Sequence, residues 1–367
     1  MLIGIDASRL KEKNKTGTEN YLYYTVKSLS KFDKENEYIL YFSEQPSDTY
    51  WNSLVSNNTR FSYRVIKKFL SWTQVSLSAA CMSDHINTLL CTWHTIPIFH
   101  KPSMKIVSVI HGLEYSKMGG GPAIYSILFS DKVIAVSNYT KSEILKLLPI
   151  KDDKIQIIYE GVDTSVYYKR SEEEVERVKN KYGIKGRYLF YIGTFGLRKN
   201  IPNMIQAFAK FIQNYNNYHE FKDISFIMGG KIPREYEGIR DLPKSLNIEK
   251  KVKFLGYVPE GDLPVLISGA HALMYVSKSE GFGLPILESL SCGTKVITSN
   301  VSATKEVGDG FVYLADPGDI DQISGTIYKS FGTDIFYNRE DLMAYLKTNF
   351  DWHENSRRIL SVLNKFK

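Results

Sequence analysis

The stretch EGFGLPILE combines a glycine-rich turn with a proline that suits the start of a helix. Pro285 fits the first helical position because it lacks an N–H group and its φ is already set. The free backbone amides of Ile286 and Leu287, together with the positive end of the helix dipole, would then form a site for phosphate. Gly281 and Gly283 permit a tight turn and the close approach of a ligand to the backbone. The stretch therefore predicts an anion-binding corner.

Two carboxylates, Glu280 and Glu288, lie eight positions apart at the ends of this stretch. Beside a diphosphate they would repel it, so we do not expect them to be phosphate ligands. They are better suited to accept hydrogen bonds from neutral donors. Glu280 precedes the turn and Glu288 lies about one turn inside the predicted helix, so the two acids bracket the anion-binding corner.

A second strand–loop–helix unit, YIGTFGLRKNIPNMIQAF, places Arg198 and Lys199 at the head of a helix and at the carboxyl end of a strand. Two cations there neutralise a diphosphate, the lysine as a point charge and the arginine through its fork of donors. For an isolated Arg-Lys pair, ordinary solvated surface cations would be the better interpretation.

Two further candidates lie in the first half of the chain. His111 in VIHGLEY directly follows an apolar run that predicts a strand, and a histidine there is either structural or faces a ligand-binding cleft. Gly17 in KTGTENY centres a turn that opens a predicted helix, so backbone amides of this turn are candidates to face the same cleft. Neither residue identifies a ligand by itself.

The composition indicates a soluble globular protein of two domains, because 367 residues exceed one ordinary core. Hydrophobic residues make up 43% and charged residues 24% of the chain, and no run reaches the roughly 18 apolar residues that span a bilayer. The N-terminal MLIGIDASRL carries Asp6 inside its apolar run and predicts a first strand instead of a signal peptide. The three cysteines have no paired spacing, which predicts neither a disulfide framework nor a zinc site and favours the cytoplasm.

Several function classes are disfavoured by the sequence. It has no metal-ligand spacing and no GxSxG, GxGxxG or P-loop pattern, which argues against hydrolases, dehydrogenases and nucleoside triphosphatases. The formal net charge of +7 is moderate, so we expect no nucleic-acid partner.

One window of the sequence is strongly basic. Residues 56–105 contain six basic residues against Asp84 alone, a net charge of +5. The basic residues are Arg60, Arg64, Lys67, Lys68, Lys101 and Lys105. Within this window RVIKKFLSWTQVSLSAACM mixes basic and bulky apolar residues, as in an interfacial helix near anionic lipid. Two interpretations stay open: peripheral membrane contact through residues 60–82, or a partly buried helix with a solvated face.

Short β-rich runs alternate with longer helical stretches along the chain, in two series separated by VDTSVYYKRSEEE. Alternation of this kind predicts parallel sheets covered by helices, so the fold class is α/β with two doubly wound domains. Two such domains joined by a linker predict a central cleft between them. In open parallel sheets ligands bind outside the carboxyl ends of the strands, where the candidate loops lie. The amphipathic DWHENSRRILSVLNKF adds a terminal helix.

Taken together, these stretches resemble the signature of glycosyltransferase family 4, which has the GT-B fold of two Rossmann-like domains. Its hallmark E-x7-E is matched by Glu280 and Glu288, within EGFGLPILESLSCGTKVITS and the following SATKEVGDGFVYLADPGD. The resemblance continues through GTFGLRKN, FLGYVPEGDL, VIAVSNYTKSEIL, IIYEGVD and FDWHENSRRIL, and IDASRL with TGTENY resembles the mannosyltransferase-like branch. It implies an acceptor-binding domain over residues 1–165, a nucleotide-sugar-binding domain over 166–349, and a helix over 350–367 that packs on the first domain.

The resemblance also implies roles for the matching residues. Arg198 and Lys199 would hold the diphosphate of a nucleotide-sugar. Glu288 would bind the ribose hydroxyls, and Glu280 would bind the transferred sugar. His111 would contact this sugar near the reacting carbon. The other implied donor-binding positions are Gly17 near the phosphates, Gly256 and Tyr257 at the base, and Gly281, Phe282, Gly283, Leu284, Ile286 and Leu287 around the turn.

The chain departs from the family pattern at two places near these residues. Thr194 follows Gly193 where many relatives have an arginine, which leaves the phosphate clamp to the Arg-Lys pair alone. Gly112 follows His111 where an aspartate is frequent, so the hydrogen-bond partner of the histidine stays open.

The expected function is retaining transfer of a hexose, with mannose favoured, from a nucleotide diphosphate-sugar to a hydroxyl of a glycan or lipid-linked glycan in cell-surface polysaccharide synthesis. We expect no cofactor and no metal, because the nucleotide-sugar is a co-substrate and the cations take the place of a metal ion. The expected location is the cytoplasm, on the inner face of the plasma membrane. The alternative is a catalytically silent partner that binds nucleotide-sugar or glycan and supports another transferase.

Overall fold

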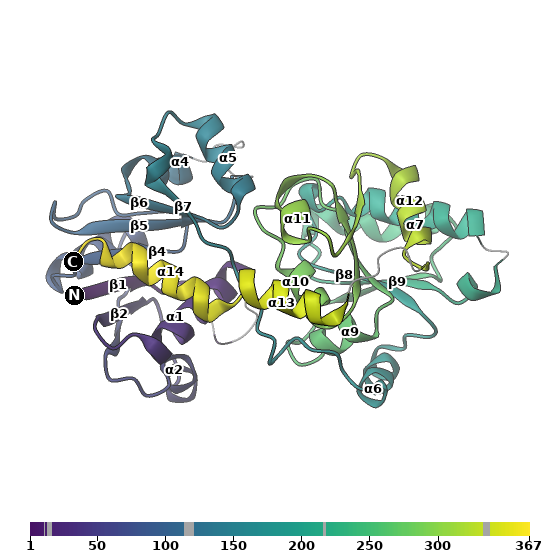
Figure 1. Ribbon diagram of the computed structural model, residues 1–367, viewed down its shortest axis with the longest axis horizontal. Helices are drawn as coiled ribbons and strands as arrows, with labels where there is room; N and C mark the ends of the chain where they lie inside the picture. Colours follow the sequence, from purple (N-terminus) through teal and green to yellow (C-terminus); the bar gives the residue numbers. More distant parts are fainter. Residues whose placement is uncertain (11, 13–16, 114–120, 216–217, 333–337) are drawn as a thin grey trace. The chain divides into compact units, whose positions relative to one another are not determined.

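The computed structural model describes the whole chain except residues 11, 13–16, 114–120, 216–217 and 333–337 (Figure 1). The chain divides into two compact units. Unit 1 comprises Met1–Gly161 with Phe350–Lys367, and unit 2 comprises Val162–Asn349. Each unit contains one parallel sheet covered by helices, which confirms the α/β class and the two Rossmann-like domains.

Unit 1 contains a seven-stranded parallel sheet in the order β3-β2-β1-β4-β5-β6-β7. Its strands are β1 (Leu2–Asp6), β2 (Glu37–Phe42), β3 (Phe61–Val65), β4 (Thr88–Cys91), β5 (Lys105–Ile110), β6 (Lys132–Ala135) and β7 (Ile155–Ile157). The central strands are apolar and buried along almost their full length, because helices cover a parallel sheet on both faces. Ile3 of β1 pairs with Tyr38 of β2 on one side and Thr88 of β4 on the other, so the winding changes direction between β1 and β4.

The last helix of the chain packs in unit 1. The helical segments of this unit are α1 (Gly17–Phe32), α2 (Asp48–Val55), the π-helix η1 (Trp72–Leu77), α3 (Ser78–Ser83), α4 (Gly121–Phe129), α5 (Asn138–Leu147), the 3-10 turn η3 (Asp152–Lys154) and α14 (Trp352–Asn364). Figure 1 shows α14 alongside α1, and the Trp352 ring stacks on Tyr24 with 5.3 Å between ring centroids. The predicted return of the terminal helix to the first domain is confirmed.

Unit 2 contains a six-stranded parallel sheet in the order β10-β9-β8-β11-β12-β13. Its strands are β8 (Tyr188–Ile192), β9 (Ser225–Gly229), β10 (Val252–Gly256), β11 (Ala272–Tyr275), β12 (Lys295–Ser299) and β13 (Tyr313–Ala315). Strands β8 and β11 are neighbours although two other strands lie between them in the sequence. The winding of this sheet therefore changes direction between β8 and β11.

The helices of unit 2 begin and end at residues with suitable local chemistry. They are α6 (Glu172–Tyr182), η4 (Leu197–Lys199), α7 (Ile201–Tyr215), η5 (His219–Phe221), η6 (Arg234–Asp241), α8 (Leu242–Ser245), α9 (Leu263–Gly269), α10 (Leu284–Ser291), α11 (Ser302–Val307), α12 (Ile320–Lys329) and α13 (Arg339–Asn349). In α6, Ser171 and Glu174 form a capping box, and Gly183 ends the helix with a φ of 58°. The predicted linker VDTSVYYKRSEEE therefore already contains the first residues of α6.

The prediction of one helix over residues 60–82 is wrong. Residues 61–65 form the edge strand β3, which pairs in parallel with β2, and only residues 72–83 are helical. Between them Leu70 has a φ of 54°, in the left-handed region that ends regular structure. The pairing with β2 is a tertiary interaction that the mixed basic and apolar sequence of the segment does not reveal.

Candidate functional site

Two loops of unit 2 meet where the winding of its sheet changes direction. The loop after β8 contains the turn η4, and the loop after the neighbouring strand β11 leads into α10. The backbone N–H of Lys278 donates to the carbonyl of Arg198 at 2.7 Å, which ties the two loops together. Open α/β sheets bind their ligands at such a change of direction.

Glu280 lies between the two predicted phosphate-binding cations. Lys199 Nζ donates to Glu280 Oε1 at 2.5 Å, and Arg198 forms an ion pair with the other carboxylate oxygen. Glu280 and Lys199 are 5% and 9% exposed, whereas the Arg198 side chain is 32% exposed. The sequence led us to expect that Glu280 binds a hydroxyl of the transferred sugar. In the structure it is also the counter-ion of both cations.

The ionisation of Glu280 follows from these contacts. Burial by itself raises the pKa of Glu280, but the charges of Lys199 and Arg198 and the hydrogen bond from Lys199 outweigh it. The pKa of this carboxyl therefore lies below its ordinary value of 4.5. Glu280 is ionised at neutral pH, and the cluster carries one negative and two positive charges.

Tyr275 completes the surroundings of Lys199, and the sequence did not single it out. Lys199 Nζ donates to the Tyr275 hydroxyl at 2.5 Å and lies 4.8 Å from the centre of its ring. Burial, followed by the charge of Glu280, raises the pKa of Tyr275 well above its ordinary value, so the hydroxyl stays neutral. Tyr275 is the last residue of β11, and this position at a strand's carboxyl end was the available signal.

The EGFGLPILE turn takes the predicted form with one exception. Gly283 has a φ of 121°, which favours glycine, and α10 starts at Leu284 with Pro285 in its first turn. The amide of Ile286 donates to the carbonyl of Gly283 at 3.0 Å. The expectation that this amide is free to bind phosphate is therefore wrong for this structure. The Glu280 amide donates to Ser302 Oγ at 3.2 Å, which anchors the start of the turn.

The remaining predicted residues of the EGFGLPILE stretch are buried or half-buried. Gly281, Phe282 and Gly283 are buried, and Leu287 is fully buried in α10. Glu288 is half-buried and lies one turn inside α10, as the sequence predicted.

Three glycines lie at the carboxyl ends of neighbouring strands in unit 2. Gly193 follows β8, Gly230 follows β9, and Gly256 ends β10. A Cβ atom at Gly230 would lie 2.0 Å from the carbonyl oxygen of Gly193, so only glycine fits there. Gly256 has a φ of 71° with open space around its Cα, and Tyr257 beside it is 55% exposed. The predicted base-binding pair therefore lies two strands away from β8 and its cations.

His111 lies in unit 1 directly after β5, and the structure identifies its partner. Its Nδ1 lies 2.8 Å from Glu160 Oε1 and its Nε2 lies 3.2 Å from the carbonyl oxygen of Thr92. The Glu160 side chain is buried and that of His111 is 9% exposed, and the Tyr21 ring forms a T-shaped contact with the imidazole, with 4.8 Å between ring centroids. Glu160 was missed as a functional residue, although it lies in IIYEGVD, because it is 49 positions away from His111.

A second histidine lies close to His111. The His94 ring is 6.3 Å from that of His111, and burial, followed by the charges of His111 and Arg9, lowers the pKa of His94 to about 4. Arg9 in turn lies over the ring of Trp93 at 4.8 Å. His94 is therefore neutral at pH 7, and sequence reasoning gave no signal for it.

Gly17 is the first residue of α1 and is exposed. The preceding part of its predicted turn lies outside the described residues. Its helix carries Tyr21, which contacts His111. In the part of the chain that the structure describes, no group of three or more His, Cys, Asp or Glu side chains is placed to hold a metal ion.

Two family models match the chain, one for each series of strands. Residues 16–166 match the model "Glycosyltransferase Family 4", and residues 172–339 match "Glycosyl transferases group 1". Among curated relatives, O-antigen chain mannosyltransferase B of Escherichia coli is 34% identical over 255 residues, which is 69% of this chain and 64% of that protein. N-acetyl-alpha-D-glucosaminyl L-malate synthase of Bacillus anthracis is 33% identical over 227 residues, 59% of this chain and 55% of that one. The chain thus matches less than two thirds of the length of each of these relatives.

Solved structures share the fold at low sequence identity. Anabaena HepE in complex with UDP and glucose has a TM-score of 0.77 at 17% identity, and the match covers 100% of both chains. WaaG, a glycosyltransferase involved in lipopolysaccharide biosynthesis, has a TM-score of 0.66 at 14% identity and covers 98% of this chain and 94% of that one. The two family models, the E-x7-E pair and the two parallel sheets agree, and the chain belongs to glycosyltransferase family 4, with the GT-B fold.

Proposed function

We propose that this chain transfers a hexose from a nucleotide diphosphate-sugar to a hydroxyl group of a glycan or lipid-linked glycan, with retention of the anomeric configuration. The observation that carries the proposal is the buried cluster of Arg198, Lys199 and Glu280 at the change of winding in unit 2. Two positioned cations at the carboxyl ends of strands suit a diphosphate, which a point-charge lysine and a forked arginine bind together.

Each member of the cluster has a distinct proposed task. Lys199 is fixed by Glu280 and Tyr275, so its ammonium is already oriented for a phosphate oxygen before a donor binds. Arg198 is the more exposed cation, and its forked guanidinium is assigned to a second phosphate oxygen. Glu280 retains acceptor capacity for a hydroxyl of the transferred sugar, since an ionised carboxylate has about four acceptor sites.

The remaining donor contacts are proposed from position. The exposed Tyr257 and the open backbone at Gly256 are assigned to the base, and Glu288 on α10 is assigned to the ribose hydroxyls. The buried glycines of the turn bring backbone close to the phosphates, with Gly17 of unit 1 as a further phosphate contact.

Catalysis would consist mainly of positioning and electrostatic stabilisation. The bond from the anomeric carbon to the diphosphate breaks, and the two cations stabilise the departing anion. A phosphate oxygen of the leaving group takes the proton of the acceptor hydroxyl as the new glycosidic bond forms on the same face. No side chain acts as a nucleophile. His111, held by Glu160, is assigned to the transferred sugar near the reacting carbon. Because the cations supply the positive charge, we propose that no metal is required.

The donor is proposed from the relatives. The HepE structures contain UDP with glucose or UDP-glucose, which supports a nucleotide-sugar. The names of O-antigen chain mannosyltransferase B and RfbU favour mannose and an acceptor in cell-surface polysaccharide synthesis. Such an acceptor would be met on the cytoplasmic side of the membrane.

The test compares nucleotide binding with turnover. Purified protein is screened by thermal shift against UDP, GDP and dTDP and their sugars, since a ligand at 100 times its Kd stabilises by about 2.7 kcal/mol. The preferred donor is then incubated with EDTA, and its slow hydrolysis is followed together with the anomeric configuration of the released sugar. We expect retention and EDTA-resistant hydrolysis. Binding without hydrolysis would favour the silent partner, and rescue of EDTA-inhibited activity by magnesium would contradict metal independence.

A further inference from the structure

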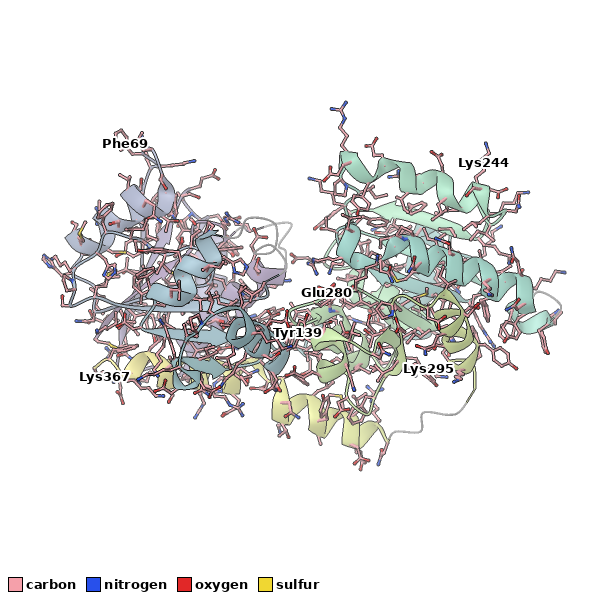
Figure 2. All side chains as sticks on the ribbon, turned by 90° about the horizontal axis from the view of Figure 1, so that it is seen from above. Phe69, Tyr139, Lys244, Glu280, Lys295 and Lys367 are labelled. Atoms are coloured by element: carbon pink, nitrogen blue, oxygen red, sulfur yellow. The ribbon has the colours of Figure 1, made fainter. Side chains whose placement is uncertain are left out.

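Two loops of unit 1 expose large apolar side chains at their tips. Phe69 and Leu70, between β3 and η1, are 68% and 80% exposed, and Ile98 and Phe99, between β4 and β5, are 49% and 71% exposed. Figure 2 shows Phe69 on a loop that projects from the body of unit 1. Scattered exposed apolar residues are ordinary, but four on two loops held together form a patch that calls for a partner. We call these four residues the apolar tip.

Both loops are attached to the same helical segment. Ser76 Oγ of η1 accepts a hydrogen bond from the Phe69 amide at 2.8 Å. Gln74 of η1 accepts from the Ile98 amide at 2.7 Å, and Ser78 at the start of α3 donates to the Phe99 carbonyl. Phe69 and Ile98 lie 29 positions apart in the sequence, and both are therefore held by the short helical segment of η1 and α3.

The base under the tip is packed into the core of unit 1. Leu77 and Ile96 belong to a buried core cluster against which Ile66 and Trp72 pack. Trp72 Nε1 also donates to Asp6 Oδ1 at 3.2 Å. Leu70 keeps a left-handed φ of 54°, which a leucine adopts only where the surroundings require it. The exposure of the tip is therefore part of the folded structure, and a bound partner would find it already formed.

The surroundings of the tip are positively charged. Lys67 and Lys68 directly precede Phe69 and are exposed, and Lys101 follows Phe99 by two positions. Asp84 is the single acid of residues 56–105, and its carboxylate is already engaged by Arg64 at 2.5 Å and by the Tyr41 hydroxyl at 3.0 Å. An apolar centre with exposed lysines beside it complements an anionic, amphipathic surface.

We propose that the apolar tip docks on a bilayer that contains anionic lipid, with the four apolar side chains in the interface and Lys67 and Lys68 at the headgroups. A second copy of the chain is the weaker candidate. In a symmetric dimer through this patch, Lys67 and Lys68 of one copy would face the same lysines of the other, and like charges repel. No helix in the described ranges is long and apolar enough to cross a membrane, so the contact proposed is peripheral. The inference concerns unit 1 alone and does not depend on the donor chemistry of unit 2.

The experiment is vesicle co-sedimentation of the full chain without nucleotide. Vesicles of phosphatidylcholine alone and with a quarter of phosphatidylglycerol are compared at low and high salt. Wild-type protein is expected to sediment with the anionic vesicles and to be released by salt, since screening weakens exposed charges. Lys67→Gln with Lys68→Gln should lower the partition coefficient about 25-fold, a factor of roughly five for each lysine. Phe69→Ser with Leu70→Ser should lower it at least about tenfold.

The matched control is Lys146→Gln with Leu147→Ser. Leu147 is 46% exposed and Lys146 is also exposed, but both lie on α5, outside the tip. The proposal requires that this control variant binds the vesicles as strongly as the wild type does. It also requires that all variants keep the melting temperature of the wild type. Absence of wild-type binding to anionic vesicles, equal binding by the tip variants, or a lipid-free dimer that the Phe69 and Leu70 substitutions dissociate would each overturn it. Nucleotide-induced thermal shifts should be the same in every variant, which separates this outcome from that of the proposed transfer reaction.

Discussion

The two units use the same architecture to hold different chemistry. Each unit contains a buried glutamate that follows a parallel strand in the sequence and is paired with a basic side chain. In unit 2 Glu280 is paired with Lys199 and Arg198, whose charges are permanent at neutral pH. In unit 1 Glu160 is paired with His111, whose Nδ1 lies 2.8 Å from the carboxylate. Unit 2 thus gathers two cations around one carboxylate, whereas unit 1 orients a single imidazole.

The difference shows that the sheet sets where a site lies but not what it binds. Both sheets change their winding at one pair of strands, β1 with β4 and β8 with β11. The chemistry is decided by a few side chains after those strands. The following predictions test whether the two clusters are independent, and they exploit the fact that all four tryptophans lie in unit 1.

The largest expected effect is on the stability of unit 2. Glu280→Ala leaves the nearly buried Lys199 without its counter-ion, and removal of one partner of a buried pair costs about 3–5 kcal/mol. The urea unfolding transition of unit 2, followed by circular dichroism, should shift to lower urea concentration. The transition of unit 1, followed by tryptophan fluorescence, should stay in place. Glu249→Ala, an exposed acid of the same unit, is the control. A shift below about 1 kcal/mol would mean that the ion pairs are not shielded from water.

The second effect is on the donor. Lys199→Ala removes a charged hydrogen-bond donor, which should weaken nucleotide diphosphate binding by about 1.5–3 kcal/mol, or about 10- to 150-fold. Titration calorimetry with UDP and GDP measures it, after the folded fraction has been checked. Lys244→Ala, on the exposed surface of α8, should bind as the wild type does. Equal affinities for both variants would remove Lys199 from the donor site.

The third effect is a loss of stability in acid that both units share. Burial lowers the pKa of His94 in unit 1 and of His271 in unit 2 to about 4, from 6.5. As the pH falls below 6.5 the unfolded chain binds the proton first, so stability is lost from about pH 6.5 down to about pH 4. Each histidine should account for about 2 kcal/mol between pH 7.5 and 5.

Variants assign this loss to each unit. His94→Gln should flatten the pH dependence that tryptophan fluorescence reports, and His271→Gln should flatten only the part seen by circular dichroism. An unchanged pH dependence in His94→Gln would show that folding does not lower the pKa of this ring.

The smallest expected effect separates catalysis from binding. Glu160→Gln keeps a hydrogen-bond acceptor for His111 but removes the negative charge beside it. We expect kcat to fall about tenfold, or about 1.4 kcal/mol, with unchanged affinity for the nucleotide diphosphate. Steady-state kinetics and calorimetry on the same sample distinguish a loss of kcat from a loss of nucleotide affinity. A parallel loss of nucleotide affinity would contradict a role for Glu160 in turnover alone.

The sequence predicted the two units unequally well for a physical reason. In unit 2 the turn, both glutamates and the α10 start lie within nine consecutive residues, and the cations follow a recognisable strand. Local chemistry such as a glycine with positive φ and a proline in the first turn is readable from such a stretch. The engagement of the Ile286 amide by Gly283 and the packing of Tyr275 on Lys199 depend on exact backbone paths, which no pattern encodes.

In unit 1 the site is assembled from distant segments. His111, Glu160 and Thr92 come from the ends of three different strands, and their meeting depends on strand order. The basic segment over residues 60–82 was predicted as a helix because its composition is mixed, whereas pairing with β2 makes its first part a strand. Tertiary pairing overrides local preference most easily in short segments of this kind.

The position of α14 has a consequence for the order in which the protein is made. Trp352 packs against Tyr21 and Tyr24 of α1, Asn355 donates to the Glu160 carbonyl at 3.2 Å, and a side chain at Gly161 would collide with the Trp352 ring. The backbone of the glutamate that contacts His111 is thus secured by a helix that the ribosome makes after all of unit 2. During synthesis unit 2 has its full complement of residues before unit 1 does. One face of α1 in the nascent first unit therefore stays uncovered until α14 has been made.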